Sequence, residues 1–158
     1  MVCATVFAVD GCYDDAFDLA IEAIERFGWY NRSCAVNPYL VEGKKTVAFE
    51  IAQQMDFEPP HKVFVPVGDG CIMSGVYKGF WEFMRLGYTS RMPKLIGVQA
   101  SGCSPVADAF EGACDAERCE ARTCADSIAV GAPRNWRKAV EAVRESGGTF
   151  LRVTDSEI

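Results

Sequence analysis

The stretch that decides the fold is residues 62–75, which read KVFVPVGDGCIMSG. Its first six residues form an apolar run bounded by turn residues, which is typical of a buried strand in a parallel sheet. Gly68, Asp69 and Gly70 end this run, and a helix is expected to begin near Cys71. A glycine-rich turn between a parallel strand and a helix presents backbone N–H groups and a positive helix end, which together can hold a phosphate.

Three kinds of phosphate loop can be compared with this turn by their spacing. The P-loop pattern Gly-x4-Gly-Lys-Ser/Thr fails because Val76 and Tyr77 follow Gly75. The dinucleotide pattern Gly-x-Gly-x-x-Gly fails because Met73 stands at the third glycine, and the next strand ends at Gln99 without an acidic residue for a ribose. A smaller monophosphate ligand remains open, as does a turn that binds nothing.

Strands and amphipathic helices alternate on both sides of this turn. Strands are expected at residues 2–9, 62–67, 94–99 and 149–153, and helices at 15–27 (with Asp14 as the N-cap), 44–55, 71–86 and 135–146. A loop is expected between the first two helices, and an irregular, cysteine-bearing stretch at residues 101–133. This alternation indicates an α/β fold with a mainly parallel sheet flanked by helices.

Composition excludes several classes of protein. The chain of 158 residues is 49% hydrophobic, which suffices for one ordinary core or part of a larger one. A net charge of -6 without a basic cluster disfavours nucleic acid and anionic membranes as partners. No apolar run reaches the roughly 18 residues of a transmembrane helix. Eight cysteines without an export signal indicate reduced thiols and a cytoplasmic location.

Both ends of the chain are expected to be cuts. The first strand begins at residue 2, and Thr154 and Glu157 form the S/T-x-x-E capping-box pattern that opens a helix. We therefore expect an internal piece of a longer protein. It would either form a homo-oligomer or need a complementary chain that supplies the missing segments, because an open sheet edge is a template for association.

Several separated segments resemble threonine synthases. They are residues 37–46 (NPYLVEGKKT), 65–70 (VPVGDG), 97–100 (GVQA), 123–128 (TCADSI), 133–136 (PRNW) and 145–148 (ESGG). The segments occur in the same order as in that family and cover nearly the whole chain. Such a series is far more specific than the glycine loop alone.

The resemblance implies a fold type II enzyme that uses pyridoxal 5'-phosphate (PLP), in the superfamily of tryptophan synthase β and cysteine synthase. Two α/β domains would enclose PLP, with residues 1–40 as the end of the smaller domain and residues 41–158 as part of the larger. The complete enzyme would be a lyase or synthase that acts on a small amino acid by elimination or replacement. Backbone N–H groups would hold the PLP phosphate, and the resemblance assigns them to Gly68, Asp69, Gly70, Cys71 and Ile72.

The chain also departs from the family pattern. No segment matches the one that carries the family's Schiff-base lysine, so no catalytic residue is assigned and this chain alone is expected to be inactive. Leu40 and Asp69 stand where relatives often have arginine and asparagine, and both changes disfavour a phosphorylated substrate. Two alternatives are an inactive remnant or partner subunit, and another member of the superfamily such as a dehydratase or ammonia-lyase.

Two other groups of residues are candidate sites. Cys114, Cys119 and Cys124 match metal-binding Cys-x2-Cys spacing poorly. Although His61 or Cys103 could add a ligand, free thiols in a loop are the favoured interpretation and no metal is expected. The pair at residues 44–45 is expected to be solvated lysines, or else a structural support beside the cleft.

Overall fold

The computed structural model describes residues 4–112 and 115–158, and it divides into two compact units, residues 1–31 and 32–158. The described residues of the first unit hold one helix, α1 (Tyr13–Phe27). Its N-cap is Cys12 rather than the predicted Asp14, because the Asp15 carboxylate accepts a hydrogen bond from the Cys12 N–H at 2.9 Å. Gly28, with a φ of 66°, ends α1 in the left-handed conformation as expected.

The strand predicted at residues 2–9 is wrong over its described part. Residues 4–9 form no strand, and Val6 and Phe7 are exposed. A strand needs a neighbour to pair with its N–H and C=O groups, and the described part of this unit contains no other strand. The apolar pattern alone therefore could not make one here.

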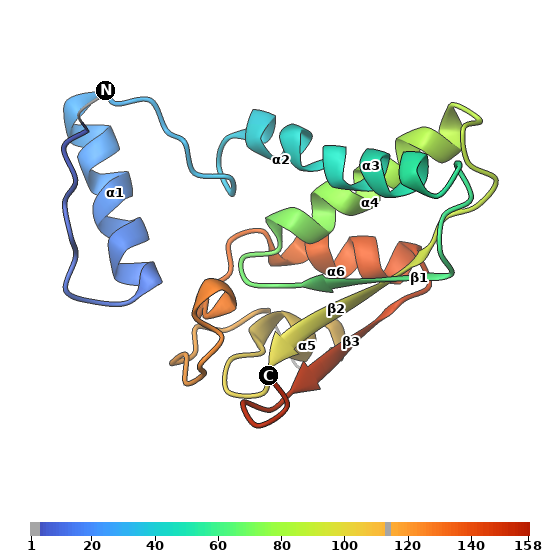
Figure 1. The fold of residues 1–158 in the computed structure, drawn as a ribbon. Coiled ribbons are helices and arrows are strands. Elements are labelled where there is room, and N and C mark those ends of the chain that lie inside the picture. Colours follow the sequence, from blue (N-terminus) through green and yellow to red (C-terminus); the bar gives the residue numbers. More distant parts are fainter. Residues whose placement is uncertain (1–3, 113–114) are drawn as a thin grey trace. The chain divides into compact units, whose positions relative to one another are not determined.

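The second unit is built on a parallel sheet of three strands in the order β1-β2-β3 (Figure 1). The strands are β1 (Lys62–Pro66), β2 (Lys94–Ala100) and β3 (Thr149–Val153). The register pairs Phe64 with Ile96, and Ile96 with Thr149. These three strands and the parallel α/β fold confirm the prediction from hydrophobic patterning.

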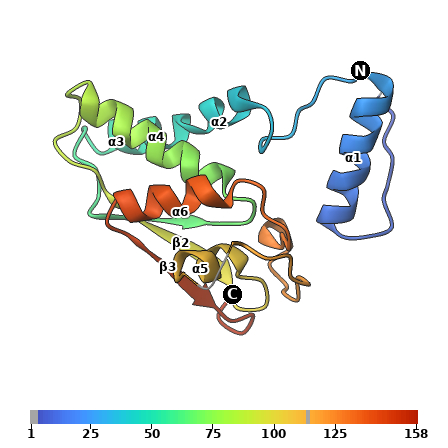
Figure 2. The ribbon, with the colours of Figure 1, turned by 180° about the vertical axis from the view of Figure 1, so that it is seen from behind.

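Three helices cover one face of this sheet: α4 (Cys71–Arg85), α5 (Pro105–Phe110) and α6 (Trp136–Glu145). In Figure 2, α5 and α6 are seen in front of the strands, and α4 lies next to α6. The core lies between these helices and the sheet, where every second strand residue points. Its largest buried members include Leu95, Met73, Phe80, Val106 and Val143.

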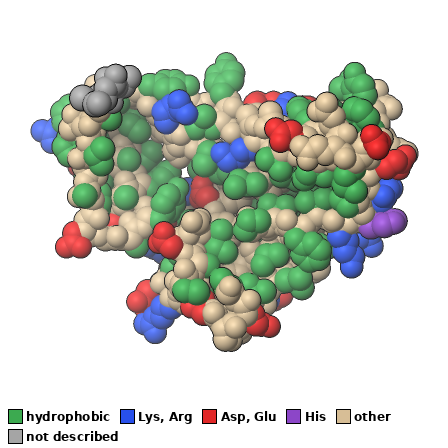
Figure 3. Space-filling view, viewed as in Figure 1, with side chains coloured by type: hydrophobic (Ala, Val, Ile, Leu, Met, Phe, Trp, Pro, Cys, Tyr) green, Lys and Arg blue, Asp and Glu red, His purple; other side chains and the backbone are tan. Residues whose placement is uncertain are grey.

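The opposite face of the sheet is apolar and partly open to solvent. Phe64 is 60% exposed and Leu151 is 43% exposed, and the strand register places both on this face. Figure 3 views the molecule from this side and shows hydrophobic side chains over the strands. Within the described part of this unit, no helix lies over this face in Figure 1.

Two further helices, α2 (Pro38–Lys44) and α3 (Thr46–Gln54), pack on α4. The sequence predicted a loop through Tyr39 and no helix before Lys44. The helix forms because the Asn37 side chain caps it, accepting a hydrogen bond from the Tyr39 N–H at 3.1 Å, and because a proline occupies its first position. The predicted helix at residues 44–55 corresponds to α3.

The stretch expected to be irregular, residues 101–133, contains α5 and a short 3-10 helix, η1 (Asp126–Ile128). At the end of the chain, residues 154–157 form a turn in which the Glu157 carboxylate accepts a hydrogen bond from the Thr154 N–H at 2.8 Å. That bond is one half of the predicted capping box. None of the described helices is long and apolar enough to cross a membrane.

Candidate functional site

The glycine loop between β1 and α4 has a set of unpaired backbone donors. Within the described residues, no acceptor is recorded for the N–H groups of Gly68, Asp69, Gly70, Cys71 and Ile72. Gly70 and Cys71 are buried residues, and a buried N–H group without a partner costs free energy. Together with the positive end of the fifteen-residue helix α4, these donors suit an anionic group.

The two glycines are required by the chain's own packing. Gly70 has a φ of 94°, and a Cβ atom there would lie 2.9 Å from the Asn135 carbonyl oxygen. A Cβ atom on Gly68 would lie 3.0 Å from a methyl group of Val130 and 3.2 Å from the Ile128 Cα. These positions therefore let α6 and the segment after η1 approach the loop closely.

The segment before α6 forms hydrogen bonds to the glycine loop. The Arg134 N–H donates to the Asp69 carboxylate at 2.6 Å, and the Asn135 N–H donates to the Asp69 main-chain oxygen at 3.1 Å. The Asn135 side chain is buried and donates to the Ser74 hydroxyl on α4 at 2.8 Å. The motif at residues 133–136, to which the sequence assigned no role, thus fixes the shape of the loop.

Gln99 supports the loop from the neighbouring strand. Its side chain is fully buried and donates to the Val67 main-chain oxygen at 3.0 Å. Its amide oxygen accepts a hydrogen bond from the Ala107 N–H in α5 at 2.9 Å. Gln99 therefore joins the start of the glycine loop to α5. The sequence offered one signal for this role, a polar residue at the end of an apolar strand.

Two thiols and a carboxylate meet at the edge of the loop. Ligand atoms of Cys34, Asp69 and Cys71 all lie within 4.8 Å of one another. Burial raises the pKa of the Cys71 thiol, and the neighbouring Asp69 carboxylate and Cys34 raise this pKa further. The sequence assigned no role to Cys34, because it lies far from the loop in the chain.

The cysteine cluster expected from the sequence to be free thiols is described only in part. Cys114 lies outside the described residues. The Cys103 and Cys119 sulfurs are 3.7 Å apart, and Cys124 is exposed. The described residues hold no group of three ligands that includes these thiols. His61, the other candidate ligand, has its Nδ1 2.9 Å from an Arg91 nitrogen instead.

Lys45 has a structural role. Its ammonium group lies 2.8 Å from a Glu82 oxygen on α4 and 2.7 Å from a Glu42 oxygen on α2. These hydrogen bonds, first to Glu42 and then to Glu82, raise the Lys45 pKa. The Lys45 side chain is only 16% exposed, so the prediction of a solvated pair is wrong for this residue.

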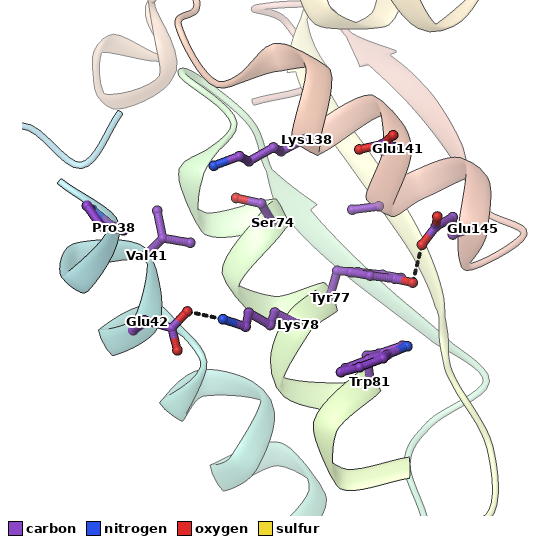
Figure 4. A pocket seen from close by; sticks show the side chains of 11 residues that line it. Pro38, Val41, Glu42, Ser74, Tyr77, Lys78, Trp81, Lys138, Glu141 and Glu145 are labelled. Carbon is purple, nitrogen blue, oxygen red and sulfur yellow. Dashed lines mark hydrogen bonds and ion pairs between the residues drawn. The ribbon is translucent and has the colours of Figure 1, made fainter. Parts of the chain in front are cut away.

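A cavity of about 400 Å³ lies between α2, α4 and α6 (Figure 4). Ser74 lines its end nearest the glycine loop, and Lys138 extends from α6 beside it. Polar groups in this cavity pair with one another, since Lys78 contacts Glu42 and the Tyr77 hydroxyl donates to Glu145. Burial and the Glu145 carboxylate raise the pKa of Tyr77 to about 12.

Comparison with known proteins places the whole chain in a family of cofactor-dependent enzymes. The sequence pattern of the family described as pyridoxal-phosphate dependent enzyme matches residues 1–158. The threonine synthase of Methanosarcina acetivorans is 41% identical over 157 residues, which are 98% of this chain and 38% of that protein. The threonine synthase of Methanocaldococcus jannaschii is 39% identical, again over 98% of this chain and 38% of that protein.

Solved structures agree on the fold. A processed form of threonine deaminase isoform 2 from Solanum lycopersicum aligns with a TM-score of 0.69 and 25% identity, over 90% of this chain and 38% of that one. Diaminopropionate ammonia lyase from Escherichia coli aligns with a TM-score of 0.66 and 21% identity, over 94% of this chain and 38% of that one. The chain thus spans about two fifths of the length of these relatives.

Proposed function

Because this chain belongs to the pyridoxal-phosphate dependent enzyme family, we propose that it forms the phosphate-binding part of a PLP enzyme resembling threonine synthase. The observation that supports this role most directly is the row of unpaired N–H groups at the glycine loop. The proposed cofactor-binding residues are Gly68, Asp69, Gly70, Cys71 and Ile72.

The residues of this chain would bind and orient the phosphate. Five N–H groups offer hydrogen bonds to its oxygens, and the positive end of α4 favours its negative charge. The Asp69 carboxylate is already engaged, since one of its oxygens accepts from the Arg134 N–H and the other lies 3.5 Å from the Cys71 sulfur. When bound, PLP supplies the electron sink for bond breaking at the α-carbon of an amino acid.

The proposed reaction of the complete enzyme is elimination or replacement on a small amino acid. Leu40 and Asp69 support a substrate without a phosphate group, since neither side chain would attract one. The likeness to threonine deaminase, at a TM-score of 0.69, favours a dehydratase or ammonia-lyase as the second candidate. A third candidate is an inactive remnant or a partner subunit, because no segment of these 158 residues resembles the one that carries the family's lysine.

The proposed domain arrangement places residues 1–40 in a smaller domain and residues 41–158 in the larger. The structure also divides into two units, but it does so after Asn31, whereas the proposed boundary at residue 40 falls within α2. The proposed compartment is the cytoplasm, where the eight cysteines would stay reduced. The proposed partners are an amino-acid substrate and a second copy or a complementary chain.

A pair of substitutions at Cys71 tests the phosphate site. Cys71 is the first residue of α4, where proline is tolerated, so Cys71→Pro removes one N–H donor and keeps the helix. Cys71→Ala also removes the thiol but keeps the N–H group. A hydrogen bond to a charged group contributes about 1.5–3 kcal/mol, so the proline variant should bind PLP and inorganic phosphate about tenfold or more weaker than the alanine variant.

Calorimetry with PLP, inorganic phosphate and pyridoxal measures this difference, and circular dichroism establishes that both variants are folded. Pyridoxal, which has no phosphate, should bind both variants equally. Equal affinities of the two folded variants for PLP would contradict the proposed role of the loop.

A further inference from the structure

Three side chains with the donor atoms of a metal site converge beside the glycine loop. Cys34 lies in the turn before α2, whereas Asp69 and Cys71 belong to the loop and the start of α4. One ligand atom of each lies within 4.8 Å of the other two. The fold therefore brings together two thiols and a carboxylate from segments that are distant in the sequence.

The spacing of these atoms fits a tetrahedral zinc ion. Zinc binds thiolate sulfur at about 2.3 Å and carboxylate oxygen at about 2.0–2.2 Å, so the ligand atoms of a tetrahedral site are roughly 3.5–3.8 Å apart. The Cys71 sulfur lies 3.5 Å from an Asp69 oxygen, which already matches one edge of such a site. The other two separations between ligand atoms are at most 4.8 Å, so these atoms would need to move closer by about 1 Å or less to bind the ion.

We propose that Cys34, Asp69 and Cys71 form a binding site for a zinc ion whose fourth position is open to water. Two sulfur ligands favour zinc over magnesium and calcium, which prefer oxygen. Each thiol releases its proton to solvent when it binds the ion as a thiolate. The sequence did not indicate this site, because its ligands do not share the short spacing of a Cys-x2-Cys pair.

The surroundings hold the carboxylate in place for this role. One oxygen of Asp69 accepts a hydrogen bond from the Arg134 N–H at 2.6 Å, and its other oxygen faces the Cys71 sulfur. The Asp69 main chain is held as well, since its carbonyl oxygen accepts from the Asn135 N–H at 3.1 Å. Ligating carboxylates in metal sites are commonly oriented by such outer hydrogen bonds.

A second pair of thiols in the chain could also bind zinc and therefore serves as the control. The Cys103 and Cys119 sulfurs are 3.7 Å apart, but the described residues place no third ligand with them. The Cys103 sulfur also lies 3.4 Å from the Val130 carbonyl oxygen, to which it donates. Cys119→Ser therefore serves as the matched control for Cys34→Ser.

The test uses the full chain with a non-thiol reductant in a buffer without phosphate. Zinc affinity is measured by competition with a chromophoric chelator, and cobalt(II) reports sulfur ligands through sulfur-to-metal charge-transfer absorption. We expect one zinc ion per chain and no competition from magnesium. Loss of a supporting residue outside a metal site typically costs 10–100-fold in affinity, so loss of a ligand in Cys34→Ser should cost about 100-fold or more. Cys119→Ser should retain the wild-type affinity.

Several results would overturn the proposal. These are a wild-type chain that binds no zinc, a cobalt spectrum without the sulfur band, and a zinc affinity that survives Cys34→Ser or disappears in Cys119→Ser. If Cys34→Ser does not fold, as judged by circular dichroism, Asp69→Asn replaces it. The asparagine keeps an oxygen for the Arg134 N–H but removes the anionic ligand, so it should also weaken zinc binding.

Discussion

At the scale of single residues, the charged and polar groups around α4 stabilise the packing of helices. Lys45 joins α2 and α4 through Glu42 and Glu82, and Tyr77 joins α4 to α6 through Glu145. These contacts connect segments that are far apart in the sequence. Their protonation states should therefore influence the free energy of unfolding.

Tyr77 should make the protein less stable at alkaline pH. Its folded-state pKa is about 12, whereas an unfolded tyrosine has a pKa of about 10. The stabilisation is complete below pH 10, and it is lost as pH rises from about 10 to 12, because the unfolded chain releases the proton first. Tyr77→Phe should therefore lose less stability over this interval than the wild type.

Urea unfolding at about pH 8, 10 and 11.5 measures this difference. Tyr39→Phe, at an exposed position on α2, is the control. Lysines also titrate in this interval, but they are the same in all three proteins. If the free energy of unfolding declined identically in Tyr77→Phe and in the wild type, ionisation of Tyr77 would not be a cause of the decline.

At the scale of elements, two glycines on α4 set how closely α2 and α3 approach it. A Cβ atom on Gly75 would lie 2.6 Å from the Lys44 Cβ, and one on Gly79 would lie 2.7 Å from the Ala48 Cβ. Small residues four apart on one helix face allow this close contact. The segment at residues 37–46 is thereby held against the helix that begins at the glycine loop.

Gly79→Ala should destabilise the protein. The new methyl group would meet the Ala48 Cβ at 2.7 Å and the Lys45 carbonyl oxygen at 2.8 Å. Overpacking of this kind costs about 1–3 kcal/mol, which exceeds the gain of up to about 1 kcal/mol from the better helix propensity of alanine. Gly43→Ala in α2, with open space around it, should instead be stabilising by roughly 0.4–1 kcal/mol. Thermal and urea unfolding distinguish the two, and a Gly79→Ala protein as stable as Gly43→Ala would contradict the packing argument.

At the scale of the whole molecule, the chain should not attach PLP covalently at a unique position. No segment resembles the one that carries the family's lysine. Borohydride reduction with PLP, followed by peptide mass mapping, should find no stoichiometric label among the six lysines, Lys44, Lys45, Lys62, Lys78, Lys94 and Lys138. A complete threonine synthase treated in parallel is the positive control. Stoichiometric labelling of one lysine in this chain would contradict the prediction.

The sequence predicted the three strands of the sheet and most of the helices, because hydrophobic periodicity reports which residues a fold buries. It failed at residues 4–9, where an apolar pattern had no strand to pair with. It also missed α2, whose formation depends on the Asn37 cap.

The sequence predicted the glycine loop of the candidate site but not the contacts that other segments make with it. The glycine spacing located the N–H groups, since they follow the chain in order. The supports from Gln99 and Asn135, and the approach of Cys34, arise from contacts across the fold. Apart from the polar Gln99 at the end of an apolar strand, local patterns gave no signal for these contacts, so the structure was needed to reveal them.

The strand order has a consequence for the order of assembly. Consecutive strands are neighbours, so the sheet grows by two crossovers, through residues 67–93 and then through the longer segment 101–148. The entropy lost on closing a loop rises with its length, so the first crossover closes at the lower cost. The glycine loop belongs to this first crossover, whereas Arg134 and Asn135, which fix its shape, arrive with the second. The supports of the glycine loop are therefore complete only when the second crossover packs against the first, which couples ligand affinity to that docking.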